Sequence, residues 1–288
     1  MDDMLKEWHW LNGRFVKKDD LYVSARLLGL LRGWAIFDYF LSIEDGLSTI
    51  TDLYLNRFYE SASELKLEVP VNKLELKNLL KELVRLNGGV QAFRVVLSAG
   101  YSSDGWNPDE PPVLIVFSES IKEIPMQWLN RGITLKTYEF LRPLPEVKTT
   151  FYAVGKLAQL EAGTDDVLFL YEGKVLETPR SNIFFVKGNT LITAGTNVLK
   201  GITRKIVIDI AREKGLEVIE RDVPLDLIYD MDGSFITGTT KPVIPVRKID
   251  NVEYDVSKMR ELFDLLRYAL IEKSGLNKHN VGSGIVNG

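Results

Sequence analysis

The chain has 288 residues, of which 45% are hydrophobic and 26% charged, the balance of a soluble globular protein long enough for two domains. Its formal net charge of −4 counts against a nucleic-acid-binding protein, because such proteins usually carry a basic excess. The lack of cysteine excludes disulfides and thiolate sites. Two histidines are too few for a multi-histidine metal site and count against a Ser-His-Asp triad, so we expect no metal.

No segment is expected to cross a membrane. The most apolar stretch, residues 27–41, is interrupted by Arg32 and Asp38 and is too short for a span. The N-terminal residues MDDMLKEWHW lack the core of a signal peptide, and no N-x-[ST] acceptor occurs. Together with the absence of cysteine, these features predict a cytoplasmic protein.

In chain order, the first part alternates strand and helix signals. WHWLNGRFVKKDD predicts a hairpin with a type I′ turn at Asn12 and Gly13. Residues 52–65 predict a helix capped by Asp52, and residues 71–86 predict an amphipathic helix that ends at a glycine pair. The apolar face of the first helix is expected to contain Leu55, Phe58, Tyr59 and Ala62. Strands are expected at 93–99 and 112–118, with the loop SSDGWNPDEPP between them.

The second part is richer in strands. Helices are expected at about 149–162, 202–214 and 256–272. Strands are expected at 133–141, 166–173, 174–179, 181–188, 190–195, 217–225, 234–238 and 243–249. The class is therefore α+β with many antiparallel pairs. We expect a small domain at 1–118, a linker at 119–131 and a larger domain at 132–288.

Two segments are candidate anion sites. Gly201, Ile202 and Thr203 begin a strong helix, whose first N–H groups and dipole attract negative charge. The turn Thr237-Gly238-Thr239-Thr240 offers hydroxyls and N–H donors between two apolar strands. An ordinary helix start and a plain turn remain the alternatives.

Three charged residues stand near apolar segments. Arg57 lies between apolar positions of the first helix and could pair with an anion, or reach solvent as a surface arginine. Lys148 lies between a Pro-bounded turn and an apolar helix, where desolvation would free its amine for Schiff-base chemistry; a solvated lysine is the alternative. Glu177 ends a strand and is either a hairpin residue or a buried partner for a cationic ring nitrogen.

These residues fall in the order and spacing of a known family. WLNGRFV, RLLGLLRGWAIFDYF, DLYLNRFYESA, ETPRSNIFFV, VLKGITRKIVIDIAREKGLEV and FITGTTKPVIPV resemble successive blocks of the class IV, or fold-type IV, pyridoxal-phosphate aminotransferases. The resemblance covers nearly the whole chain. It implies a two-domain enzyme with a small N-terminal α/β domain and a larger cofactor-binding domain with a barrel-like sheet.

The resemblance also implies roles for single residues. Lys148 would carry pyridoxal 5′-phosphate covalently, and Glu177 would pair with its ring nitrogen. The phosphate would be held by Arg57, Gly201, Ile202, Thr203 and Thr239, with Leu199 against the ring and Tyr152 near the ring hydroxyl. Substrate contacts would come from Phe37, Arg94, Thr239 and Thr240.

The sub-family stays open at this level. The loop 102–112 lacks the Arg-x-His pair of D-amino-acid aminotransferases, and Ala92 stands where branched-chain enzymes have tyrosine. Phe37, Phe40 and Trp34 would give apolar walls, which favours an L-amino acid with an apolar or branched side chain and a 2-oxo acid as partner. The alternatives are an aminodeoxychorismate lyase, a D-amino-acid aminotransferase and a catalytically silent pyridoxal-phosphate-binding paralogue. The family also implies a homodimer with shared active sites, and Trp106 is the aromatic residue expected to approach the neighbouring subunit.

Overall fold

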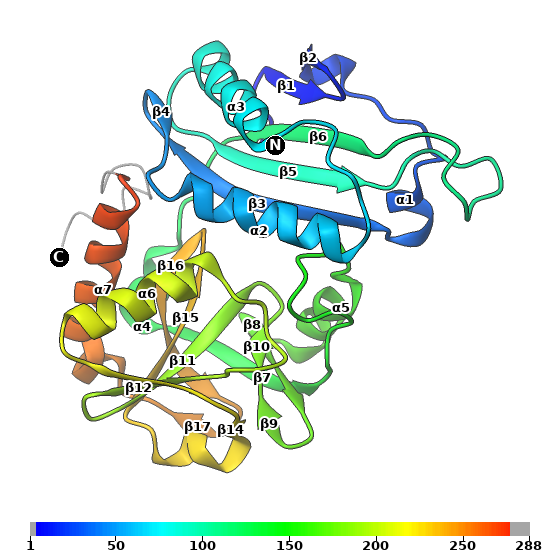
Figure 1. Cartoon of the computed structure of the whole chain (residues 1–288). Helices are drawn as coiled ribbons and strands as arrows, with labels where there is room; N and C mark the ends of the chain where they lie inside the picture. The colour runs from blue at the N-terminus through cyan, green and yellow to red at the C-terminus, as the bar shows by residue number, and fades with distance from the viewer. Residues whose placement is uncertain (1–3, 277–288) are drawn as a thin grey trace. The chain divides into compact units, whose positions relative to one another are not determined.

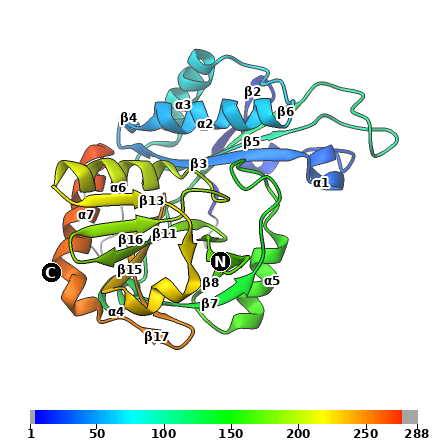
Figure 2. The same cartoon turned by 60° about the horizontal axis from the view of Figure 1, so that its bottom comes forward.

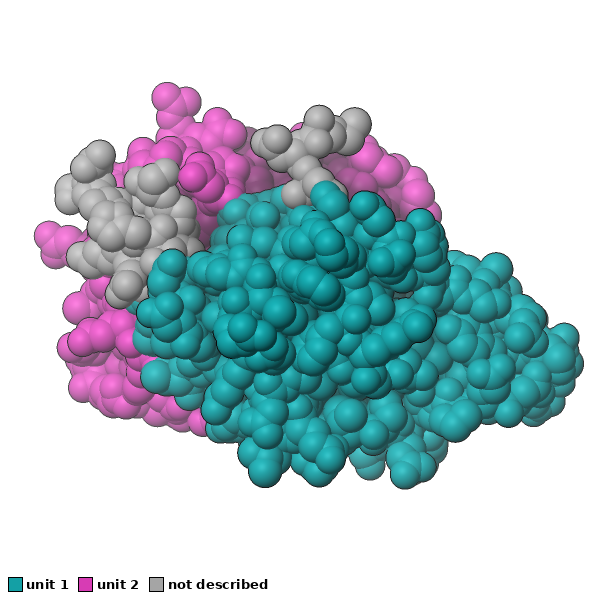
Figure 3. Space-filling view, turned by 90° about the horizontal axis from the view of Figure 1, so that it is seen from above, with its two compact units in different colours: residues 1–122, 147–151, 274–280 teal, residues 123–146, 152–273, 281–288 magenta. Residues whose placement is uncertain are grey.

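The computed structural model describes residues 4–276, which form two compact units (Figure 1). Within that range, unit 1 comprises residues 4–122, 147–151 and 274–276, and unit 2 comprises residues 123–146 and 152–273 (Figure 3). The domain boundaries expected from the sequence stay a prediction. In the described residues, no helix is both long enough and apolar enough for a membrane span.

Unit 1 contains a six-stranded sheet with the order β2-β1-β6-β5-β3-β4 in the described part of the chain. The expected hairpin joins β1 and β2, and Asn12 and Gly13 take the positive φ angles (44° and 100°) of a type I′ turn. The strands are β1 (Trp8–Leu11), β2 (Arg14–Lys17), β3 (Ala35–Ile43), β4 (Gly46–Leu47), β5 (Ala92–Ser98) and β6 (Val113–Glu119). The helices are η1 (Lys18–Asp20), α1 (Leu28–Arg32), α2 (Thr51–Glu64) and α3 (Lys73–Asn87).

Helix α2 runs alongside β3 (Figure 1) and buries three of the four predicted face residues, Leu55, Phe58 and Ala62. The ring of Phe40 on β3 stacks on Tyr54 with 5.3 Å between centroids, which ties the helix to the sheet. The prediction that Asp52 caps α2 is wrong. The cap position is Ile50, and the Asp52 carboxylate instead accepts a hydrogen bond from Lys77 Nζ of α3 at 2.8 Å.

Helix α3 has a well-formed N-terminus. Asn72 accepts a hydrogen bond from the backbone of Glu75, and the Glu75 side chain accepts one from the Asn72 backbone. This reciprocal capping box satisfies two N–H groups and sets the helix start at Lys73, two residues later than expected.

Unit 2 contains an eleven-stranded sheet that curls into a half-barrel in the described residues (Figure 2). Its main path is β13-β12-β11-β15-β16-β7-β8-β9-β14, and β10 and β17 pair with β11 and β16. The strands are β7 (Ile133–Glu139), β8 (Asp166–Tyr171), β9 (Lys174–Val175), β10 (Glu177–Thr178), β11 (Ser181–Lys187), β12 (Thr190–Thr193), β13 (Glu217–Glu220), β14 (Val223–Pro224), β15 (Gly233–Gly238), β16 (Lys241–Ile249) and β17 (Val252–Glu253). The expected α+β class with a barrel-like sheet is confirmed.

Helices and sheet of unit 2 share an apolar core. Phe184 and Phe235 stack on neighbouring strands with 5.0 Å between centroids, and Phe263 of α7 meets Phe235 edge-on at 5.3 Å. These contacts attach α7 to the sheet. The helices are α4 (Met126–Arg131), α5 (Ala153–Ala162), α6 (Ile202–Glu213), η2 (Leu225–Asp230), η3 (Val256–Met259) and α7 (Arg260–Lys273).

Helix α5 begins four residues later than the expected start at Thr149. Thr149 bridges to Ile36 of β3, and the Thr150 N–H donates to the Ala35 carbonyl at 3.2 Å. Residues 147–151 therefore belong to unit 1 as an extended segment. β-Branched threonines favour such a conformation over a helix.

Candidate functional site

The candidate residues are distributed over both units. Lys148, Arg57, Phe37 and Arg94 lie in unit 1. Unit 2 holds the others, which are Glu177, Leu199, Gly201, Ile202, Thr203, Thr239, Thr240 and Tyr152. Each unit therefore presents its own group of side chains.

Glu177 is the best-anchored candidate in unit 2. It lies on β10 and is only 5% exposed. Its Oε1 accepts from Arg142 Nε at 2.9 Å, and its Oε2 accepts from Asn182 Nδ2 at 3.2 Å and from the Leu199 N–H at 3.1 Å. Three donors from three segments stabilise the negative charge and fix the carboxylate in place.

Arg142 is a residue that the sequence reasoning missed. It is 6% exposed, and besides Glu177 it binds the Pro145 carbonyl through Nη2 at 2.5 Å. The prolines at 143 and 145 mark a turn, but no local signal links this arginine to a carboxylate 35 positions later. Because both charges have left water, removing either partner would leave the other as an unpaired buried charge.

Asn182 connects Glu177 to the start of α6. Its Nδ2 donates both to Glu177 and, at 2.8 Å, to the Leu199 carbonyl. Its Oδ1 lies so close to Gly201 that a Cβ at that position would collide with it. A larger residue at 201 would therefore force the Asn182 side chain to move away from its partners, which is a packing reason for a residue that the sequence indicated only as part of a helix start.

The N-terminus of α6 fits an anion. No side chain of the described residues caps it, since its cap residue is Gly201. Ile202 and Thr203 are buried, at 8% and 6% exposure, and they belong to the first turn, whose N–H groups have no partner inside the helix. The helix dipole adds positive potential at this end.

The Thr237–Thr240 turn lies beside this group. Thr237 faces Asn182 across the β11–β15 ladder, and the chain then turns at Thr239 and Thr240 before β16. The predicted hairpin turn is thus confirmed. Around Asn182, unit 2 brings together Glu177, the start of α6 and the β15–β16 turn.

Tyr152 occupies the cap position of α5, at the edge of unit 2, and is half-buried. Its carbonyl accepts the Lys156 N–H at 3.0 Å. Its role near a ring hydroxyl stays a prediction.

In unit 1, the backbone of Lys148 is attached to two elements. Its carbonyl accepts the Phe37 N–H of β3 at 3.0 Å, and its N–H donates to Ser61 Oγ of α2 at 3.4 Å. Its Nζ lies 4.7 Å from the centroid of the Phe37 ring. An ammonium group over an aromatic face is attracted by the ring and partly desolvated.

Arg57 on α2 forms an ion pair with a carboxylate of its own unit. Its Nε and Nη2 donate to the two oxygens of Asp38 on β3 at 2.9 and 2.7 Å, and its guanidinium lies 5.5 Å from the Tyr54 ring. Asp38 is fully buried. The expectation that Arg57 reaches inward to an anion is met by Asp38, and its predicted phosphate contact stays a prediction.

Arg94 on β5 makes a second forked pair in unit 1. Its Nε and Nη2 donate to Glu119 at 2.7 and 3.0 Å. The guanidinium lies 5.0 Å from the Tyr39 ring and 6.0 Å from the Phe37 ring. The predicted substrate residues Phe37 and Arg94 therefore lie together with Lys148 within unit 1.

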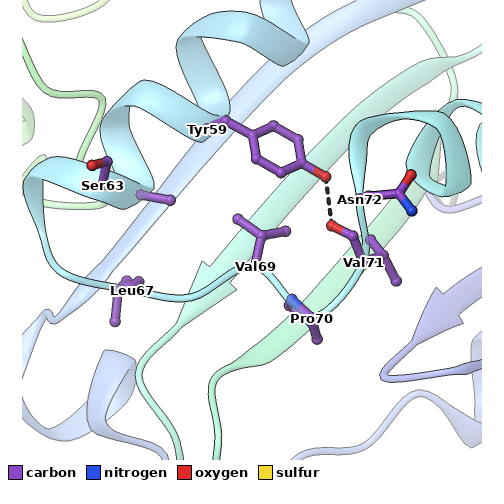
Figure 4. A pocket seen from close by; sticks show the side chains of 8 residues that line it. Tyr59, Ser63, Leu67, Val69, Pro70, Val71 and Asn72 are labelled. Atoms are coloured by element: carbon purple, nitrogen blue, oxygen red, sulfur yellow. Dashed lines mark hydrogen bonds between the residues drawn. The ribbon is translucent and has the colours of Figure 1, made fainter.

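A separate pocket of about 420 Å³ opens in unit 1 between α2 and the segment that leads to α3 (Figure 4). The Tyr59 hydroxyl donates to the Val71 carbonyl at 2.7 Å across it, and burial raises the pKa of Tyr59 to about 12. None of the candidate residues lines this pocket, so it is distinct from the groups described above. Its lining consists of Tyr59, Ala62, Ser63, Leu67, Val69, Pro70, Val71 and Asn72.

Comparison with known proteins identifies the family of this chain. Residues 35–249 match the model of the family Amino-transferase class IV. A putative branched-chain-amino-acid aminotransferase of Methanocaldococcus jannaschii is 33% identical over 84% of this chain and 87% of its own length. An aminodeoxychorismate lyase of Bacillus subtilis is 29% identical over 85% of this chain and 87% of its own.

Among solved structures, a T.th. branched-chain amino acid aminotransferase complexed with N-(5′-phosphopyridoxyl)-L-glutamate is similar to this chain with a TM-score of 0.83. It is 28% identical, and the similarity covers 96% of this chain and 97% of that one. The family match extends over most of the chain and includes the segments that carry Lys148, Glu177 and the start of α6. The chain therefore belongs to the class IV aminotransferases, and it is a pyridoxal-phosphate-dependent aminotransferase.

Proposed function

We propose that this chain transfers an amino group between an L-amino acid with an apolar or branched side chain and a 2-oxo acid, using pyridoxal 5′-phosphate held by Lys148. The observation that carries the proposal is the Glu177 carboxylate, buried and fixed by Arg142, Asn182 and the Leu199 N–H. Such a carboxylate suits a protonated ring nitrogen, because it offers a localised negative charge in a site shielded from water.

The donor set of unit 2 fits this cofactor. The anion site at the start of α6 would take the phosphate through the Gly201, Ile202 and Thr203 segment, helped by Thr239. Leu199 would pack against the ring, since its backbone already donates to Glu177. From unit 1, Arg57 is assigned to the phosphate and Lys148 to the covalent attachment. Tyr152 is assigned to the ring hydroxyl.

When bound, the cofactor supplies an electrophilic carbon and a ring that withdraws electrons from the substrate Cα. Lys148 Nζ would then act as the base that takes the Cα proton and as the acid that returns it. Thr240 and its neighbours in the turn would orient the substrate carboxylate through N–H donors. Glu177 would hold the proton on the ring nitrogen through its charge.

The substrate assignment rests on two supports. Phe37 beside Lys148 offers an apolar surface for a hydrocarbon side chain. Relatives named as branched-chain aminotransferases are found both by sequence and by structure. A lyase is the second candidate, favoured by the Bacillus subtilis relative alone.

We also assign the enzyme to a homodimer, with Trp106 approaching the neighbouring subunit. Trp106 is 67% exposed. Asp104 fixes its loop by accepting hydrogen bonds from Ser102 Oγ and from the Trp106 and Asn107 N–H groups, and such bonds, led by those of Asn107, lower the pKa of Asp104. A preformed loop that presents an aromatic side chain is typical of an interface anchor. Sedimentation showing a fully active species of one chain mass, 32.7 kDa, would contradict this assignment.

A half-reaction screen tests the proposed reaction. The holoenzyme is mixed with single L- and D-amino acids in the absence of any oxo acid, and the absorbance of the bound cofactor is followed. We expect L-leucine, L-isoleucine and L-valine to change the spectrum, and continuous turnover to require a 2-oxo acid. Pyruvate release without an acceptor would support the lyase, and a response to D-alanine alone would support a D-amino-acid enzyme. No response to any amino acid would indicate a silent paralogue. The matched control is Lys148→Ala, which should respond to none.

A further inference from the structure

The forked pair of Arg94 and Glu119 joins neighbouring strands of unit 1. Arg94 lies on β5 and Glu119 ends β6, and both hydrogen bonds are between 2.7 and 3.0 Å. The Glu119 side chain is 9% exposed, whereas that of Arg94 is 40% exposed. The carboxylate is therefore the buried member, and the arginine is the member that the surroundings can reach.

This pair lies on the sheet face that carries Phe37 and Tyr39. These two residues alternate on β3 and point to one side, and Tyr39 is directly opposite Arg94 in the β3–β5 ladder. The guanidinium contacts both rings, and the Lys148 amine lies over the Phe37 ring from the same unit. The side chains of Arg94 and Lys148 thus both lie near the Phe37 ring, and Arg94 is paired with Glu119.

Tyr39 adds no charge to this face at neutral pH. Burial, assisted by the charge of Glu119, raises the pKa of its hydroxyl to about 12, although Arg94 acts in the opposite sense. The sheet face next to Lys148 therefore carries two aromatic rings and an ion pair of opposite charges. Replacing Glu119 would remove the carboxylate to which Arg94 donates both bonds, and an arginine fork is the group best suited to bind a carboxylate.

We propose that Glu119 determines substrate specificity: by holding Arg94, it selects substrates with an uncharged side chain over those with a second, side-chain carboxylate. The selection is by exclusion, since a dicarboxylate would have to displace a buried anion that already makes two charge-assisted bonds. This inference rests on the proposed function, because only that function places the reacting amino group of the substrate next to Lys148.

Two non-reacting probes test the proposal. Glutarate has two carboxylates and pentanoate has one, on chains of equal length, and both lack an amino group. Their dissociation constants are measured by calorimetry on the holoenzyme for wild type, Glu119→Gln and the double variant Arg94→Gln, Glu119→Gln. The matched control is Glu82→Gln, which removes the same charge from a surface pair with Arg85 in unit 1.

We expect wild type and Glu82→Gln to prefer pentanoate. Glu119→Gln should shift the ratio toward glutarate by roughly tenfold to a hundredfold, the range for one charge-assisted contact. The double variant should lose this gain, because it lacks the arginine that binds the second carboxylate. A ratio in Glu119→Gln within twofold of that in Glu82→Gln, in protein that keeps its cofactor, would overturn the proposal. So would a gain that survives in the double variant. Failure of Lys148 to hold the cofactor would instead overturn the proposed function and, with it, this inference.

Discussion

Unit 1 and unit 2 each contain a buried arginine–carboxylate ion pair, and the two pairs have different roles. In unit 1, Arg57 meets Asp38 with two parallel hydrogen bonds, and Asp38 also accepts the neighbouring Tyr39 N–H at 2.7 Å. In unit 2, Arg142 meets one oxygen of Glu177, whose other oxygen accepts Asn182 and the Leu199 N–H. Each carboxylate accepts at least three hydrogen bonds, but the donors belong to different parts of the fold.

The difference lies in what each pair joins. The Arg57–Asp38 fork links α2 to β3, which already pack against each other through Phe40 and Tyr54. The Glu177 network joins the segment after β7, strand β11 and the chain just before α6, and it ends at the N-terminus of α6, for which we propose anion binding. We infer that the first pair mainly stabilises unit 1 and that the second mainly positions a carboxylate for chemistry.

Asp38→Ala should have the largest effect on stability, because it leaves Arg57 buried without its carboxylate. We expect the free energy of unfolding to fall by about 3–5 kcal/mol, measured by urea denaturation. The double variant Asp38→Leu, Arg57→Met should recover much of this loss, since no charge is then left unpaired. Arg57→Ala should also weaken cofactor binding, with added pyridoxal 5′-phosphate restoring activity. A loss of unfolding free energy below about 1 kcal/mol in Asp38→Ala would contradict the inference that the Arg57–Asp38 pair mainly stabilises unit 1.

Glu177→Gln should affect the chemistry more than the fold. We expect it to retain the cofactor and to slow proton transfer from the substrate Cα by roughly 3–4 kcal/mol, or about a hundredfold to a thousandfold. Single-turnover kinetics under saturating amino acid measure this rate. Arg142→Gln should slow it less, by about tenfold, because Asn182 and Leu199 still hold the carboxylate. Unchanged single-turnover rates in Glu177→Gln would rule out its assigned role.

The local features of the fold were predictable from the sequence. The Asn12-Gly13 turn, the amphipathic α3 and the strong start of α6 each depend on residues a few positions apart. Strand β3 was not predicted, because its sequence AIFDYFLSI is a mostly apolar run without regular alternation, which periodicity cannot assign to a strand or a helix. The extended segment at Thr149 was missed for another reason, since it depends on pairing with Ile36, far away in sequence.

The candidate site also has features that the sequence predicts and features that it does not. The order of Arg57, Lys148, Glu177 and the helix start at Gly201 could be recognised because each lies in a distinctive short block. The contacts that give these residues partners could not, because they depend on strand register and loop closure. Arg142 reaches Glu177 across 35 positions, and Arg94 reaches Glu119 across 25. No composition or spacing rule indicates such pairs.

The attachment of the cofactor to Lys148 is the central claim, and peptide mapping tests it most directly. The purified holoenzyme is reduced with borohydride, digested and analysed by mass spectrometry for the lysine that carries the reduced pyridoxyl group. We predict the modification on Lys148, in the peptide that contains Val147 and Thr149, and none in Lys148→Ala treated in parallel. Modification of a different lysine in the wild-type enzyme, such as Lys200 or Lys241, would contradict the account.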